Sequence, residues 1–262
     1  MIKNRLKTLW AEGQPALNGW LCLPNSFTAE VMAEQGWDSV TVDMQHGLIG
    51  YEAMVSMLQA VRASGVTPLV RVPWLAAEPI MKALDAGAYG IICPMVNTRA
   101  EAEQLVSWVR YPPLGTRSFG PLRAAVSAGG NYAHEANDEI ICLAMIETEA
   151  AAANVEEIAS TPGLDGVYIG PADLAFSLSR GRLTPGFDRE EPEVVDAIRQ
   201  IVASARAQGK HAGLHTAKPE YAARALGWGV DFTTVGVDVF FMAEAAAAAV
   251  SRFRSIAAAP AK

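Results

Sequence analysis

The chain has few of the residues that bind phosphate-rich partners or cross a membrane. Only 19% of its 262 residues are charged, and the formal net charge is -7. Binding to nucleic acid or to an anionic membrane requires clustered lysine and arginine, and the sequence contains no such cluster. It also lacks the uninterrupted apolar run, roughly 18 residues or more, that a transmembrane helix requires. We therefore expect neither nucleic acid nor a membrane as a partner.

Cysteine is scarce as well. Cys22, Cys93 and Cys142 each lie in an apolar run and show none of the paired spacings of zinc or redox sites. Residues 1–13 mix basic side chains with isolated apolar ones and lack the apolar core and cleavage site of a signal peptide. Reduced, buried thiols without a targeting signal indicate a cytoplasmic protein.

Two further absences disfavour particular enzyme classes. No Gly-x-Gly-x-x-Gly pattern follows a strand-like run, although open doubly wound sheets often carry this phosphate-binding fingerprint. Enzymes that work through a Schiff base need a lysine desolvated inside the fold. The chain has six lysines, Lys3, Lys7, Lys82, Lys210, Lys218 and Lys262. None of them falls within a strand-like run, which disfavours this class of enzyme.

Apolar residues, in contrast, make up 51% of the chain, enough for a large core in one domain. Short apolar runs alternate with segments of helical periodicity such as 28–35, 51–63 and 100–109, which is typical of βα units around a parallel sheet. Eight strands are predicted, at 17–23, 39–44, 68–72, 90–95, 140–146, 166–169, 211–215 and 232–235. Eight such units predict an α/β fold, a single-domain (β/α)₈ TIM barrel over 1–262, with an open doubly wound sheet as the alternative.

Three segments depart from the regular alternation. Residues 111–139 form a long connection with glycine and proline, and such connections are usually lids or binding loops. Its Arg117 and Arg123 either meet an anionic substrate or serve surface solvation or packing across a subunit contact. Residues 177–192 lead to a helix expected to begin near residue 193. The alanine-rich stretch 244–259 is strongly helical, and it is either the last barrel helix or a helix that docks on a barrel or a partner subunit.

Polar side chains end several predicted strands, where the βα loops of a barrel form its active face. Glu147 and Asp173 follow neighbouring strands, whose axes lie about 4.8 Å apart if the strands are parallel. Two carboxylates at that spacing can converge on one hard cation. The alternative is two solvated acids in the first turns of helices.

Several motifs occur in one order along the chain: Asp-Met-Gln-His at 43–46, Val-Arg-Val-Pro at 70–73, Pro-Met-Val at 94–96, Tyr-Pro-Pro-Leu-Gly-Thr-Arg at 111–117, Ile-Glu-Thr at 146–148 and Gly-Pro-Ala-Asp-Leu at 170–174. Over residues 17–237 the chain resembles the HpcH/HpaI family of class II aldolases, of the 4-hydroxy-2-oxoheptanedioate aldolase type. The resemblance implies a (β/α)₈ barrel and a hexamer, a trimer of dimers, with helices exchanged between subunits. It also implies reversible joining of a 2-oxo acid, pyruvate or hydroxypyruvate, to an aldehyde through a metal-bound enolate.

The resemblance assigns roles to residues of this chain. Glu147 and Asp173 match the family's metal ligands, for which Mg²⁺, Mn²⁺ or Co²⁺ is suitable. The backbone amides of Ala172 and Asp173, at an expected helix start, are suited to the substrate carboxylate. Arg71 matches the arginine that stabilises the enolate, with a purely structural salt bridge as the alternative.

His46 matches the family's general base, and Asp43, three residues earlier, is expected to orient its ring. Asp85 matches a family aspartate credited with raising the basicity of the histidine. It lies before the fourth predicted strand, so we expect it to act across a subunit interface or else to belong to an ordinary helix end at Gly87.

Four positions bear on substrate choice. Gln45 stands where many family members have glutamate, and Met145 replaces a glutamine that contacts substrate or its waters. Fewer anions near the metal suggest hydroxypyruvate over pyruvate as donor. Leu214 and Trp20, at the ends of strands seven and one, are expected to line the acceptor pocket or to be plain barrel residues.

Two other enzyme classes use the same metal and arginine on this scaffold, coenzyme A ester lyases and enzymes that handle phosphoenolpyruvate. Each needs an added nucleotide or phosphate site, and the sequence shows no basic glycine-rich loop for one. A barrel that only binds a metabolite is the non-catalytic alternative, which predicts that removal of metal leaves function intact.

Overall fold

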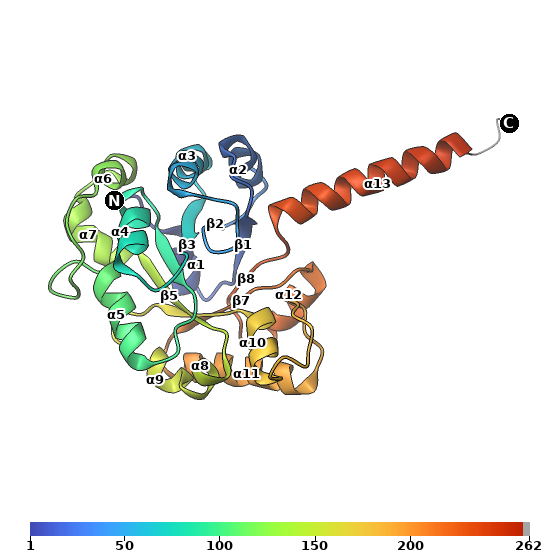
Figure 1. The fold of residues 1–262 in the computed structure, drawn as a ribbon. Helices are drawn as coiled ribbons and strands as arrows, with labels where there is room; N and C mark the ends of the chain where they lie inside the picture. The colour runs from blue at the N-terminus through green and yellow to red at the C-terminus, as the bar shows by residue number, and fades with distance from the viewer. Residues whose placement is uncertain (259–262) are drawn as a thin grey trace.

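The structure, a computed structural model, describes residues 1–258. Eight parallel strands pair in chain order and close into a barrel (Figure 1). The strands are β1 (Ala16–Leu21), β2 (Ser39–Asp43), β3 (Thr67–Arg71), β4 (Gly90–Cys93), β5 (Ile141–Ile146), β6 (Gly166–Ile169), β7 (His211–Leu214) and β8 (Phe232–Thr233). The predicted (β/α)₈ fold is confirmed, and the open-sheet alternative is wrong because β1 pairs with β8.

All eight predicted strands are present, although most of their ends differ by one or two residues from the prediction. The apolar runs in the sequence extend beyond the last residue of each strand, because the loop residues that follow at the mouth of the barrel are buried too. His215, for example, lies beyond β7, yet its backbone N–H still donates to the carbonyl of Ile169 at 3.1 Å.

The chain also forms helices, most of which surround the barrel and cover the outer side of the strands, whereas the last one projects away from it (Figure 1). They are α1 (Arg5–Ala11), α2 (Ser26–Ala33), α3 (Tyr51–Val61), η1 (Arg62–Ser64), α4 (Ala77–Asp85), α5 (Arg99–Val109), α6 (Leu122–Ala128), α7 (Tyr132–Glu139), α8 (Glu149–Ala153), α9 (Val155–Ala159), α10 (Pro171–Leu178), α11 (Pro192–Ala207), α12 (Pro219–Leu226) and α13 (Asp238–Ala258). No helix of residues 1–258 is long and apolar enough to span a membrane.

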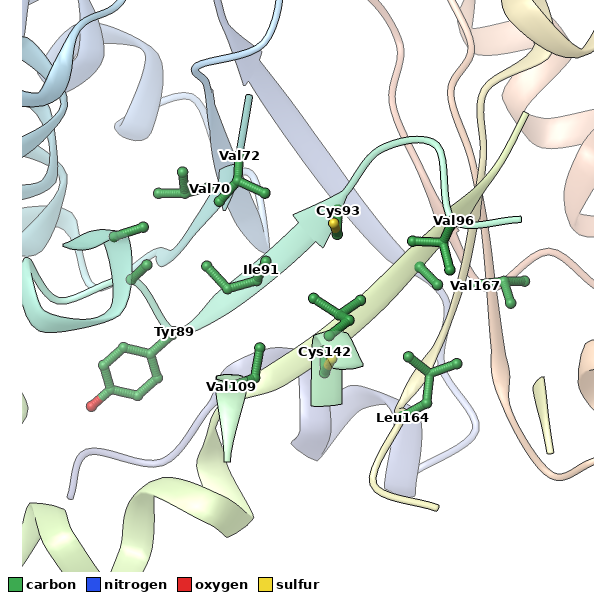
Figure 2. Close-up of a cluster of buried hydrophobic side chains, with 14 of the residues drawn as sticks. Val70, Val72, Tyr89, Ile91, Cys93, Val96, Val109, Cys142, Leu164 and Val167 are labelled. Carbon is green, nitrogen blue, oxygen red and sulfur yellow. The ribbon is translucent and has the colours of Figure 1, made fainter. Parts of the chain in front are cut away.

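Side chains on each strand alternate between two cores because successive Cβ atoms point to opposite faces. On β5, Cys142, Ala144 and Ile146 pack in an outer core between strands and helices, whereas Leu143 and Met145 pack inside the barrel. Figure 2 shows part of the outer core around β4 and β5. This alternation decides which residues can reach a site in the barrel mouth.

The expected long loop at 111–139 is wrong, because it contains helices α6 and α7. Arg117 is buried, pairs with Asp85 at 2.7 Å and lies over the rings of Tyr111 and Tyr132. Arg123 donates to backbone carbonyls, including that of Leu58 at 3.1 Å. Both arginines therefore serve packing, and neither belongs to the lining of the main cavity.

The alanine-rich stretch is helical as predicted, but helix α13 begins earlier, at Asp238, and residue 259 lies outside the described residues. Asp238 fixes its start, since its carboxylate accepts the backbone N–H groups of Cys22 at 2.9 Å and Leu23 at 3.1 Å. Beyond this anchor the helix leaves the barrel (Figure 1), and residues 242–258 are all exposed. The expectation that it packs as the last barrel helix is wrong.

Candidate active site

A cavity of about 430 Å³ opens at the carboxyl ends of the strands. Its size suits a small metabolite. Glu147 lies two residues beyond Met145, and Arg71 two beyond Leu69, so strand alternation turns both side chains inward. The full lining is Trp20, Cys22, Leu23, Asp43, His46, Leu48, Arg71, Met145, Glu147, Gly170, Pro171, Ala172, Asp173, Phe187, His215, Val237, Val239 and Phe240.

Glu147 is a buried carboxyl, with only 1% of the residue exposed. The backbone N–H of Met95 donates to its Oε1 at 2.8 Å. Burial raises the pKa of Glu147 to about 7, the charge of Asp173 adds to the increase, and the Met95 amide and Arg71 oppose it. A Cβ at position 170 would lie 2.4 Å from Glu147 Oε2, so any larger residue there would displace the carboxylate.

Asp173 lies in the first turn of α10. Gly170 caps this helix in an extended conformation and Pro171 occupies its first position, where its missing N–H costs nothing. Helix amino ends present unpaired N–H groups and a partial positive charge. The amides of Ala172 and Asp173 at the cavity wall are therefore suited to an anionic group.

These residues fit a divalent metal ion. The charge of Asp173 raises the pKa of Glu147, so Asp173 lies close enough to disfavour the ionised form of Glu147. A cation between them would relieve both the repulsion and the cost of burial. No cluster of three or more His, Cys, Asp or Glu ligands occurs within residues 1–258, and a site with two carboxylates that leaves other positions to water and substrate is typical of Mg²⁺.

Arg71 is fixed by Asp43 in a two-pronged ion pair, with Nε 2.8 Å from Oδ1 and Nη2 2.6 Å from Oδ2. The Trp20 indole N–H also donates to Asp43, at 3.2 Å, and its ring lies under the guanidinium. Burial alone would raise the pKa of Asp43, but Arg71 outweighs it and holds that pKa below its ordinary value. Arg71 therefore forms the expected salt bridge and also lines the cavity, and its role toward an enolate stays a prediction.

His46 also lines the cavity. The expected contact between Asp43 and the His46 ring is absent from residues 1–258, and Asp43 contacts the backbone of His46 instead. Asp43 Oδ1 accepts the backbone N–H groups of Gln45 at 3.0 Å and His46 at 3.3 Å, which shapes the turn after β2. Its other donors are Arg71, the Trp20 indole and the Cys22 thiol. Asp43 therefore positions Arg71 and the His46 backbone rather than the imidazole.

Of the other predicted site residues, some line the cavity and some lie outside it. Trp20 and Met145 line the cavity, whereas Gln45 does not, and its buried Oε1 has no partner. Leu214 is fully buried in the outer core, so its predicted place in the pocket is wrong. Asp85 ends α4, outside the lining, where it binds Arg117.

Several lining residues were not predicted. His215, one position beyond Leu214, faces inward, and strand alternation in the sequence is the signal that could have found it. Cys22 is two residues beyond Trp20, and burial raises the pKa of its thiol to about 12, so it stays protonated. Phe187, in the connection before α11, and residues around the start of α13 also line the cavity, and periodicity gives no signal for them.

Comparison with known proteins gives concordant results. The family model described as HpcH/HpaI aldolase/citrate lyase matches residues 18–245. A hydroxypyruvate/pyruvate aldolase of Rhizorhabdus wittichii is 44% identical over 97% of this chain and 100% of its own length. A 4-hydroxy-2-oxo-heptane-1,7-dioate aldolase of Salmonella heidelberg is 37% identical, covering 96% of this chain and 95% of its own length.

Among solved structures, an HpcH/HpaI aldolase/citrate lyase family protein from Burkholderia cenocepacia superposes with a TM-score of 0.88 at 29% identity. The superposition covers 96% of this chain and 100% of that protein. The barrel and its order of elements are thus shared with experimentally determined structures.

Proposed function

The chain belongs to the HpcH/HpaI aldolase/citrate lyase family, and from this premise we propose that it is a divalent-metal-dependent aldolase of 2-oxo acids. It is an aldolase, a carbon–carbon lyase, as its relatives at 37% and 44% identity are. The observation that carries the metal-dependent mechanism is the buried Glu147, which shares the cavity with Asp173 and Arg71.

Glu147 and Asp173 are proposed to hold the metal ion. When bound, a divalent ion supplies Lewis-acid polarisation of a carbonyl oxygen. We propose Mg²⁺ or Mn²⁺, with Co²⁺ as a substitute, because hard carboxylate oxygens suit these ions. The amides of Ala172 and Asp173 at the start of α10 are proposed to hold the carboxylate of the 2-oxo acid.

Arg71 is proposed to stabilise the enolate. Its guanidinium is permanently charged and already held by Asp43, so little reorganisation is needed when negative charge develops on the ketone oxygen. In the cleavage direction, His46 accepts the proton of the hydroxyl group, the carbon–carbon bond breaks and the aldehyde leaves. His46 then returns the proton, directly or through a water, to the enolate carbon, which regenerates the 2-oxo acid and the free imidazole.

Metal removal tests the proposal directly. We expect a chelator to abolish release of the 2-oxo acid, and added Mg²⁺ or Mn²⁺ to restore it, because the Lewis acid contributes several kcal/mol to the barrier, which is about 10³-fold in rate. Retro-aldol turnover is measured against chelator concentration, with Ca²⁺ and monovalent salt as controls. Full activity in a sample shown to be metal-free by elemental analysis would exclude a metal-dependent aldolase.

His46→Ala is expected to lower turnover by about 10²-fold or more, because general acid–base catalysis contributes about that much. The same substitution should slow deuterium exchange into the methyl group of pyruvate, followed by NMR in D₂O, if His46 moves that proton. His134→Ala is the matched control, since His134 lies on α7 away from the cavity. Wild-type turnover in His46→Ala would remove His46 from the mechanism.

Pyruvate and hydroxypyruvate are the donors we propose, since the relative from Rhizorhabdus wittichii is named for both. Of the two sequence departures, only Met145 lines the cavity. Met145 replaces a neutral glutamine, so it removes a hydrogen-bonding amide and leaves the number of anions unchanged. The preference for hydroxypyruvate that we propose rests on Gln45, which stands where many family members have glutamate. Initial rates with each donor and one common aldehyde test this preference, and a strong preference for pyruvate would contradict it.

The rival enzymes on this scaffold are less well supported. Coenzyme A and phosphoenolpyruvate carry phosphate groups, which clustered basic side chains usually bind. Within residues 1–258, Arg71 is the only lysine or arginine of the cavity lining, and Asp43 already pairs with it. The same observation disfavours Schiff-base chemistry.

We also propose that helix α13 packs on another subunit, in a hexamer built as a trimer of dimers with exchanged helices. At about 1.5 Å per residue its 21 residues span about 32 Å. Its large apolar side chains are exposed, including Met242 at 59%, Val250 at 49% and Phe253 at 70%. Within its own subunit Asp85 binds Arg117 and lies outside the cavity. A contact between Asp85 and His46 would therefore have to form between two subunits of such an assembly.

Phe253→Asp is expected to reduce the molecular mass measured by light scattering, because a charge would be buried in the contact formed by α13. Ser255→Asp, on the opposite side of the same helix, is the matched control and should leave the mass unchanged. A monomeric wild-type protein, or an unchanged mass in Phe253→Asp, would contradict helix exchange.

We place the enzyme in the cytoplasm, because Cys22, Cys93 and Cys142 are all free thiols and two of them are buried. Its proposed partners are a small 2-oxo acid, an aldehyde and other copies of the same chain.

A further inference from the structure

His215 is a buried imidazole in the active-site cavity to which the mechanism above assigns no role. It follows β7, and alternation along the strand turns Leu214 outward and His215 inward. Only 7% of the residue is exposed. A polar ring held at the wall of a substrate cavity is a candidate for substrate recognition.

The ring is held firmly by its neighbours. It meets the Trp20 ring edge-on, with centroids 4.6 Å apart, and lies 4.6 Å from the Phe187 ring. Tyr168, inside the barrel, places its hydroxyl 3.1 Å from Nδ1. These contacts fix both the position and the orientation of the imidazole, so its second nitrogen has a defined direction.

The imidazole is neutral at physiological pH. Burial lowers the pKa of His215 to about 3, and the positive charge of Arg71 adds to the decrease, while Asp43 opposes it. Burial raises the pKa of Tyr168 far above its ordinary value, so the phenol keeps its proton. A phenol that keeps its proton can donate to Nδ1, and we assign this direction to the bond, which places the ring's own proton on Nε2. Within residues 1–258, the His215 side chain forms its hydrogen bond through Nδ1, and Nε2 has no hydrogen-bond partner.

The Nε2–H group of His215 belongs to a cavity wall that is otherwise largely apolar. Phe187 and the apolar residues at the start of α13, Val237, Val239 and Phe240, supply much of the remaining wall. An uncharged donor in such a wall favours a neutral oxygen, because binding a hydroxyl there leaves no charge unpaired. Anionic oxygens have better partners at Arg71 and at the start of α10.

We propose that His215 is a specificity-determining residue, whose Nε2–H donates to a hydroxyl group on the carbon next to a reacting carbonyl. The inference rests on the proposed aldolase function and names the substrate class of the same cavity. Two substrates can carry this hydroxyl, namely the donor, as in hydroxypyruvate, or the acceptor, as in glycolaldehyde. A site built to bond a hydroxyl discriminates against the analogue that lacks it.

The test compares four reactions: pyruvate or hydroxypyruvate as donor, each with acetaldehyde or glycolaldehyde as acceptor. The value of kcat/KM is measured for the wild type, His215→Leu, His215→Gln and Tyr168→Phe. His215→Leu removes the donor, whereas glutamine places an amide N–H near the position of Nε2. Tyr168→Phe keeps the imidazole but removes the bond that fixes its tautomer.

We expect His215→Leu to lower kcat/KM for the hydroxylated substrate, relative to its deoxy analogue, by about 10-fold, the worth of one neutral hydrogen bond. His215→Gln should recover part of this ratio, and Tyr168→Phe should lose part of it. A loss confined to hydroxypyruvate assigns the bond to the donor, and a loss confined to glycolaldehyde assigns it to the acceptor.

Two results would overturn the inference: ratios that stay at the wild-type value in His215→Leu, or an equal fall in all four reactions that glutamine does not rescue. Circular dichroism of each variant separates the second result from unfolding, and Tyr168→Phe remains informative if His215→Leu does not fold. Failure of the proposed function itself would be recognised differently, because the wild type would then turn over none of the four pairs.

Discussion

Glu147→Gln is expected to abolish retro-aldol turnover, with a loss of about 10³-fold or more, because it removes a charged ligand of the proposed metal ion. The amide has the shape of the carboxyl, so the fold should persist. The backbone N–H of Met95 requires an acceptor at the position of Oε1. The glutamine NH₂ must then occupy the position of Oε2, where it presents donors instead of a ligand oxygen.

Three measurements make this prediction specific. Turnover is followed by release of the 2-oxo acid, metal affinity by calorimetric titration with Mn²⁺, and folding by thermal unfolding. Asp173→Asn should behave like Glu147→Gln. Glu149→Gln is the matched control, since Glu149 starts α8 only two residues away but is exposed and outside the cavity. Wild-type rates with bound metal in either ligand variant would refute the assignment.

Arg71→Lys is expected to lower kcat by about 10² to 10³-fold, the cost of losing one preorganised donor to a developing oxyanion. Lysine keeps the charge, but it cannot form both bonds to Asp43 and still face the substrate, because its ammonium is a single point rather than a fork. KM should change less than kcat, since the lost interaction is strongest in the transition state.

The controls separate catalysis from folding. Arg71→Met would leave Asp43 charged and buried, which costs about 3 to 5 kcal/mol when one partner of a buried pair is removed, so it should unfold more readily than Arg71→Lys. Arg99→Lys, in an exposed ion pair on α5, is the matched control for the substitution. A kcat for Arg71→Lys within about twofold of the wild type, at equal stability, would assign Arg71 a structural role alone.

The sequence predicted the strands more accurately than the loops. A strand buried on both sides is an apolar run, and eight such runs identified the barrel. The residues after β5 and β6 were predictable because parallel strands bring their carboxyl ends to one face, so Glu147 and Asp173 had to lie near each other. Helices α6 and α7 are not predicted because they are short, with Pro121 before the first and Gly129 and Gly130 between the two.

Errors within the site have specific causes. Leu214 was chosen over His215 because the strand end was judged by its apolar character, whereas alternation by one residue moves a side chain to the opposite face. Asp43 was assigned to the His46 ring because the two are close in sequence. In the fold, Arg71, 28 residues further along, lies on the neighbouring strand and takes both carboxylate oxygens.

The sequence by itself determined the barrel, the family and the chemical identity of the groups at the strand ends, because each follows from local patterns of a few residues. Only the tertiary structure decided how those groups are paired, which of two adjacent residues enters the cavity, and where α13 goes. Those outcomes depend on strand register and on contacts between residues far apart in the chain. The burial that sets the pKa of Glu147 to about 7 and that of His215 to about 3 arises in the same way, from the closed barrel as a whole.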